Sequence, residues 1–227
     1  TYTADQTAAD ALDVNDSVTD TFVYTLSDGT ATDTANLVIT VTGVNDTPTA
    51  QNDVGFIDEG ETLTVTNGAN ANVSGSYDAD EEHSGDLIDT SSSSHQDSDP
   101  DASPTLRISA IQPSGGSSSS VSSGSSYNSS GTSVTGTYGT LTIGADGSYT
   151  YAANDSISGF DANETLTDTF TYTLSDEHDA TDTATLTITL LGQDNEAPSA
   201  TNNTNAVNED ATVTVSYTHL RAHETSP

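Results

Sequence analysis

One ten-residue segment occurs twice in the chain, and this repetition limits the possible folds more than any other feature. Residues 19–28 read TDTFVYTLSD, and residues 167–176 read TDTFTYTLSD. The two phenylalanines, Phe22 and Phe170, lie 148 positions apart (170 − 22) in a chain of 227 residues. Repetition over a distance of this size indicates a tandem array of similar domains. The function of the chain should therefore be sought in an array of domains and not in one self-contained domain.

The similarity between the two copies continues on the C-terminal side, with small shifts in spacing where loops are expected. The paired segments are residues 31–35 with 180–184, 37–40 with 186–189, 43–48 with 192–198, and 59–65 with 209–215. We therefore expect one complete repeat and parts of two others. The expected segments are residues 1–48, the C-terminal part of a preceding repeat; 49–198, the complete repeat; and 199–215, the first strand of a following repeat.

Apolar and polar residues alternate through the repeated segments. In residues 167–176, phenylalanine, tyrosine and leucine occupy every second position with threonine between them, and a similar pattern follows at 186–190. A period of two is typical of a strand with one buried face, and threonine suits the exposed face. Asp146-Gly147 predicts a tight hairpin turn within residues 141–151, because glycine readily adopts a positive φ. We expect an all-β fold, an antiparallel Greek-key β-sandwich of immunoglobulin type.

Two polar segments do not follow this alternation. Residues 91–103 are polar and contain three aspartates, and residues 114–133 consist almost wholly of serine and glycine. Both lack the apolar side chains that a core requires. We expect both to be surface loops on either side of a strand at 106–111, with the Ser/Gly-rich loop disordered.

The charge of the chain excludes several classes of partner. It has 35 Asp and Glu against 2 Lys and Arg, a formal net charge of −33, and no cysteine. We expect no binding to nucleic acid, because no basic surface is available to neutralise phosphates. No apolar run is long enough for direct membrane insertion. Since disulfides cannot form, stability outside the cell must have another source.

The ordered motifs of the second half resemble one known family, the VCBS repeat. They are GTYGTLTI at 136–143, DGSYTY at 146–151, LTDTF at 166–170, and SD at 175–176. The resemblance implies a cadherin-like β-sandwich in tandem repeats within large bacterial adhesins of the RTX type, which type I secretion exports. It further implies an extracellular location on the bacterial cell surface, with neighbouring repeats of the same chain as partners. The exit sequence DNEAP at 194–198 departs from the Asn-Asp-x-Pro of the family.

Closely spaced carboxylates are the candidate metal ligands. Asp97, Asp99 and Asp101 alternate along one short segment, where they repel one another unless a cation lies between them. Hard oxygen ligands in this number suit Ca²⁺. Asp78 and Asp80, in a second acidic cluster that includes Asp86, form another candidate site. A solvated acidic surface without any metal would also account for these residues.

The boundaries between repeats form a third candidate group. The resemblance to cadherin-like arrays implies that the end of one domain, the linker and the start of the next share calcium ions, which stiffen the joint. The candidate ligands are Asn45, Asp46 and Glu59 at the first boundary, and Asp194, Asn195, Glu196 and Glu209 at the second.

Two functions of different class agree with these features, and neither is enzymatic. No Gly-x-Ser-x-Gly, His-Glu-x-x-His or phosphate-binding glycine loop occurs, so we expect no catalysis. The first function is a calcium-stabilised structural extender of a surface adhesin that supports adhesion or biofilm formation. The alternative is a module that binds a glycan or a surface protein through its loops, where Tyr77 and Tyr127 are the only candidate aromatic residues.

The last residues of the chain have a different character. The segment VSYTHLRAHET at 215–225 resembles the translation of a common transposase-based sequencing adapter. We expect residues 216–227 to be an artefact of this kind and exclude them from the inferences about fold and function.

Overall fold

The computed structural model describes residues 1–5, 7–68, 73–74, 83–90, 95–155, 157–193 and 206–212. The chain divides into two compact units, Thr1–Asn195 and Glu196–Pro227. In the second unit only residues 206–212 are described, and they form a turn without strand or helix. The remainder of the strand predicted at 199–215, and the segment 216–227, lie outside the described residues.

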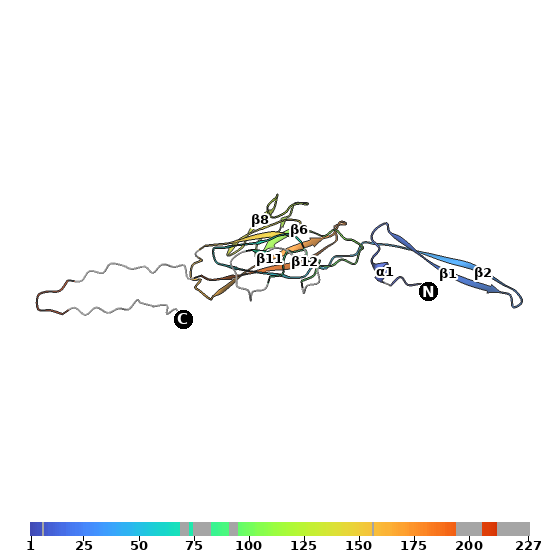
Figure 1. Cartoon of the computed structure of the whole chain (residues 1–227), viewed down its shortest axis with the longest axis horizontal. Helices are drawn as coiled ribbons and strands as arrows, with labels where there is room; N and C mark the ends of the chain where they lie inside the picture. Colours follow the sequence, from blue (N-terminus) through green and yellow to red (C-terminus); the bar gives the residue numbers. More distant parts are fainter. Residues whose placement is uncertain are drawn as a thin grey trace. The chain divides into compact units, whose positions relative to one another are not determined.

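The helices and strands of the first unit are almost all strands, with one short helix (Figure 1). Its elements are α1 (Thr7–Asp10), β1 (Ser17–Ser27), β2 (Thr32–Thr42), β3 (Asp53–Asp58), β4 (Thr62–Val65), β5 (Val73–Ser74), β6 (Arg107–Pro113), β7 (Ser119–Ser120), β8 (Thr132–Thr135), β9 (Gly139–Ile143), β10 (Tyr149–Ala153), β11 (Thr165–Ser175) and β12 (Thr181–Leu191). Among the described residues, no helix has the length and apolar character needed to cross a membrane.

The strands β3 to β12 form two five-stranded sheets, ordered β5-β4-β10-β9-β8 and β3-β12-β11-β6-β7. The predicted all-β sandwich is confirmed. Among the described residues, every strand pair is antiparallel except β3 with β12, which runs parallel from Asp53 opposite Leu186 to Asp58 opposite Leu191. This parallel pair was not predicted from the alternating pattern, which does not distinguish the direction of a neighbouring strand.

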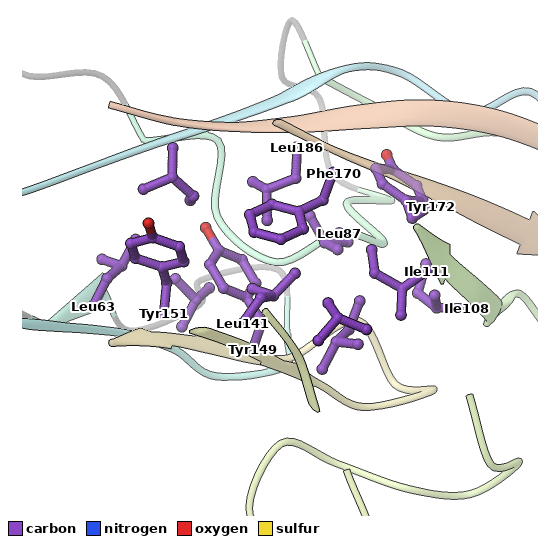
Figure 2. Close-up of a cluster of buried hydrophobic side chains, with 14 of the residues drawn as sticks. Leu63, Leu87, Ile108, Ile111, Leu141, Tyr149, Tyr151, Phe170, Tyr172 and Leu186 are labelled. Carbon is purple, nitrogen blue, oxygen red and sulfur yellow. The ribbon is translucent and has the colours of Figure 1, made fainter. Parts of the chain in front are cut away.

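The core lies between the two sheets, and the predicted alternation places its residues correctly. Phe170 and Tyr172 of β11 are fully buried, while the threonine between them is exposed. Figure 2 shows Phe170 and Leu186 on one side of the core and Tyr149 and Tyr151 on the other. Each such side chain contributes about 1.5–3 kcal/mol by burial. The predicted hairpin at 141–151 is also confirmed, with the Gly147 φ at +86°.

The structure corrects the expectation for the Ser/Gly-rich segment at 114–133, which is not a disordered surface loop. Strand β7 pairs with β6 along the edge of one sheet, and the Val121 side chain next to it is buried. The Ser125 side chain is buried as well, and its Oγ accepts a hydrogen bond of 3.0 Å from the Ala145 N–H. The Val121 side chain and serine hydroxyls attach the segment to the sandwich. The composition of the segment did not predict this order, because one buried apolar residue and a few hydrogen bonds are enough to produce it.

Strands β1 and β2 form a separate two-stranded sheet. The hairpin has the same strand lengths and the same pairing as β11–β12, with Phe22 opposite Leu37 as Phe170 is opposite Leu186. Its apolar face is nevertheless exposed, whereas the corresponding face of β11–β12 is buried.

Candidate functional site

The linker that precedes β3 meets two acidic segments of the sandwich in one cluster. The Asn45 amide Nδ2 donates to Asp176 Oδ2 at 2.9 Å, and the Asp46 backbone N–H donates to Asp101 Oδ2 at 2.9 Å. The Asp101 backbone N–H in turn donates to Asp99 Oδ1 at 2.9 Å. We call these five residues the junction cluster: Asn45, Asp46, Asp99, Asp101 and Asp176.

Asp176 is positioned by the turn between β11 and β12. Its Oδ1 accepts the backbone N–H groups of His178 at 2.8 Å and Ala180 at 2.9 Å. Asp28 makes the equivalent two bonds in the β1–β2 turn, so the Ser-Asp motif forms the same turn in both copies. The contact of Asp176 with Asn45 was not predicted, because the two residues lie 131 positions apart.

Three oxygen atoms of the junction cluster are buried without a hydrogen-bond partner: Asn45 Oδ1, Asp99 Oδ2 and Asp101 Oδ1. Leaving a buried acceptor unsatisfied costs about 1–3 kcal/mol, and more for a charged group. Burial raises the pKa of Asp99, and the charges of Asp101, Asp176 and Glu177 raise it further. The cluster therefore combines excess negative charge with acceptors that no protein donor satisfies.

The chemistry of this oxygen set fits a hard cation, which prefers carboxylate and amide oxygens. Among the described residues, however, no three His, Cys, Asp or Glu side chains already form an arrangement that could hold a metal ion. Asn45, Asp99 and Asp101 supply one amide and two carboxylate groups. Backbone carbonyls or water would have to complete the six to eight ligands that calcium takes.

Asp97 belongs to a second group, which consists of buried carboxylates. Asp53, Asp86 and Asp97 are each at most 3% exposed. Burial raises the pKa of Asp97 to about 7 and that of Asp53 and Asp86 to about 6. Hydrogen bonds from the Gln51 N–H to Asp97 and from the Tyr172 hydroxyl to Asp53 oppose part of this shift. Asp86 and Asp97 also line an open cavity of about 710 Å³, together with Asp99 of the junction cluster.

One further buried carboxylate, Asp168 of β11, is fully satisfied by the protein. It accepts hydrogen bonds from the Thr137 and Tyr138 backbone N–H groups at 2.8 and 2.9 Å, and from the Tyr151 hydroxyl at 2.6 Å. Sequence reasoning did not single out Asp168, although it is in phase with Phe170 on the inward face of the strand. Its role is structural, because three donors stabilise its charge.

Glu59 does not join Asn45 and Asp46. Because β3 runs parallel to β12, the end of β3 lies beside the end of β12. The Glu59 N–H accordingly donates to Leu191 O at 2.9 Å. Leu191 is ten residues beyond Thr181 in β12, a span of about 30 Å at the rise of an extended strand. The Glu59 carboxylate accepts the Ile157 N–H and, at 3.4 Å, the Gln193 N–H. It therefore lies beside the C-terminal end of β12, at the end of the sandwich where the second boundary was predicted.

The structure does not place the other predicted ligands in the junction cluster. Glu209 is exposed. The remaining ones lie outside the described residues: Asp78, Asp80, Asp194, Asn195 and Glu196.

Comparison with known families identifies the sandwich. Residues 45–192, more than half of the chain, match the family described as the bacterial cadherin-like domain. The match extends from Asn45 of the junction cluster to the residue after β12, so it includes both five-stranded sheets. A search of curated proteins found no match. The family match supports the cadherin-like part of the resemblance, whereas the VCBS and RTX assignments stay predictions.

Proposed function

The chain belongs to the bacterial cadherin-like domain family, and on this premise we propose that it is a structural extender repeat of a bacterial cell-surface adhesin. Membership of this family suggests an extracellular role for the chain, either in adhesion or as a structural domain. Domains of the family are typically non-enzymatic. In our proposal the repeats are of the VCBS kind and follow one another in a secreted, RTX-type protein. Their task is to hold a terminal adhesive module away from the cell during adhesion or biofilm formation.

Calcium binding at the junction cluster is the second part of the proposal. The observation that carries it is the set of three buried, unpartnered oxygens on Asn45, Asp99 and Asp101. A bound Ca²⁺ would satisfy these oxygens and offset the repulsion between the carboxylates. Asn45 belongs to the linker, whereas Asp99 and Asp101 belong to the loop before β6. Ligation would therefore tie the linker to the body of the repeat and stiffen the joint.

Thermal melting of the full chain, with calcium and with chelator, tests the calcium proposal. At a calcium concentration about a hundred times the dissociation constant, preferential binding to the native state adds about 2.7 kcal/mol. For a domain of this size, we expect the melting temperature to rise by about 5–10 °C. Equal melting temperatures in calcium and chelator, or an equal rise with magnesium, would contradict the proposal.

A matched pair of variants separates the site from general charge effects. Asp101→Asn keeps the shape of the side chain and an acceptor for the Asp46 N–H but removes the charge, so it should abolish most of the calcium-dependent rise. Asp161→Asn removes one carboxylate from an exposed position before β11 and should retain the full rise. Equal losses in the two variants would point to non-specific charge screening.

No observation favours the alternative of a module that binds a glycan or a surface protein. Of the two candidate aromatic residues, Tyr77 lies outside the described residues, and Tyr127 is half-buried with its N–H bonded to Ser148 Oγ.

A further inference from the structure

The β1–β2 hairpin exposes an apolar face that its counterpart in the sandwich buries. We call this surface the hairpin face. Its members, with their exposed fractions, are Phe22 (48%), Tyr24 (53%), Leu26 (70%) and Leu37 (51%). The corresponding residues of β11 and β12 are fully buried: Phe170, Tyr172, Leu174 and Leu186. A continuous apolar surface of this kind marks a site of contact with another protein surface.

The two hairpins agree in backbone pairing as well as in sequence. In the first, eleven residues of β1 pair with eleven of β2, from Ser17 opposite Thr42 to Ser27 opposite Thr32. In the second, the pairing runs from Thr165 opposite Leu191 to Ser175 opposite Thr181. A shift of one residue would turn the apolar side chains to the other face, so the hairpin face has the register of a sandwich interior.

Tyr2 adds an observation that does not depend on the hairpin alone. Its hydroxyl donates to Asp20 Oδ2 at 2.6 Å, and its ring meets the Phe22 ring edge-on, with centroids 6.2 Å apart. In the complete repeat, the Tyr151 hydroxyl donates to Asp168 Oδ2 at 2.6 Å, and its ring meets Phe170 at 6.1 Å. Tyr151 belongs to β10, which lies in the opposite sheet.

The Tyr2 contact therefore reproduces one contact between the two sheets of a sandwich. Counted along the chain, Tyr2 precedes Phe22 by 20 residues (22 − 2), and Tyr151 precedes Phe170 by 19 (170 − 151). Thr1 and Tyr2 thus correspond to Thr150 and Tyr151, at the centre of β10. Tyr2 therefore makes on the hairpin face the same two contacts that Tyr151 of β10 makes in the complete repeat.

We infer that β1 and β2 close another cadherin-like sandwich, and that the hairpin face packs against a sheet equivalent to β4, β10 and β9. The occupant is a chain segment preceding Thr1, similar in sequence to residues 49–149. In the complete repeat, the side chains that cover β11–β12 come from these strands and include Leu63, Leu141 and Tyr149. A second copy of the chain is a poorer occupant, because each copy carries a formal charge of −33 and repels the other.

The chain itself supplies the probe for this inference. An additional copy of residues 49–149, called the prefix, is fused directly before Thr1 of the full chain. The prefix supplies the part of a repeat that precedes Thr150 in the complete repeat. Hydrogen–deuterium exchange is then followed in peptides from β1 and β2, with β11 and β12 as the internal reference. We expect exchange in β1 and β2 to slow by about 100-fold on addition of the prefix and to approach that of the reference strands. Rapid exchange in β1–β2 beside protected β11–β12 would overturn the inference.

Two substitutions in the prefixed protein keep the test specific. Phe22→Asp should remove the new protection, because the counterpart Phe170 is fully buried. Val23→Asp should retain it, because the counterpart Thr171 is exposed on the outer face. Both residues are exposed in the chain without the prefix, so the two substitutions should differ in effect only if a completed sandwich buries Phe22. Equal effects of the two substitutions would contradict the inference.

Protection of β1–β2 in the unprefixed chain that rises with protein concentration would identify a second copy as the occupant and would likewise overturn the inference. The exchange experiment is run in calcium and in chelator. The inference does not require calcium, so its failure is distinguishable from failure of the calcium proposal.

Discussion

Asp97 makes the stability of the repeat depend on pH in an unusual direction. Its carboxyl group is 2% exposed and lies near the charges of Asp53 and Asp89, and its pKa is raised from 3.8 to about 7. A carboxyl group with a raised folded-state pKa binds its proton more tightly in the folded state than in the unfolded state. The folded protein is therefore stabilised as the pH falls through about 7, and the full contribution is present only below about pH 4.

The magnitude follows from the two pKa values. Between about pH 7.5 and pH 5.5, a shift of this size changes the free energy of unfolding by about 2 kcal/mol. The side of Asp97 that faces the open cavity is screened by solvent, which reduces the expected change to about 1 kcal/mol. The raised pKa of Asp53 and Asp86, about 6 for each, acts in the same direction.

The perturbation is Asp97→Asn, which retains an acceptor for the Gln51 N–H but cannot titrate. Urea unfolding is followed by circular dichroism at both pH values in the presence of chelator, so that no cation competes with the proton. We expect the variant to be more stable than the parent at pH 7.5 by at least about 1 kcal/mol, with a weaker pH dependence. Other titrating groups are common to both proteins and cancel in the comparison. A parent protein that loses stability between pH 7.5 and 5.5, or a variant with an unchanged pH dependence, would refute the reasoning.

Two further substitutions test the packing. Tyr151→Phe removes one of the three donors to Asp168, and we expect a loss of about 1.5–3 kcal/mol in urea unfolding, since a hydrogen bond to a buried charge is lost. A loss below about 0.5 kcal/mol would show that the two backbone donors suffice. Val121→Ser removes the apolar anchor of the Ser/Gly-rich segment, so hydrogen exchange should accelerate in residues 114–131 and stay unchanged in β11. Uniform acceleration in both regions would contradict a local role for Val121.

The sequence predicted those features that depend on local patterns. Alternation located β11 and β12 with the correct inward residues, and Asp-Gly located the turn of the hairpin at 141–151. The features that were missed depend on contacts between distant residues. The parallel neighbour of β12 is β3, more than a hundred positions earlier, and this pairing places Glu59 next to Leu191 at the end of β12. Likewise, burial of Asp53 depends on Tyr172, 119 positions away.

The buried carboxylates of the repeat differ in what offsets their charge, and this difference separates structural from candidate functional residues. Lysine is absent, and the one arginine among the described residues, Arg107, pairs with Asp179 at 2.6 Å. The charge of a buried carboxylate in the described residues is then offset by histidines, such as His95 near Asp53, by hydrogen bonds, by a bound proton or by an external cation. Asp168 uses hydrogen bonds from the protein, and Asp97 can bind a proton near neutral pH. Asp99 and Asp101 each keep a buried oxygen without a hydrogen-bond partner, so an external cation would act on these two residues. Asp101 also contacts the linker through Asp46, which would couple such a cation to the joint.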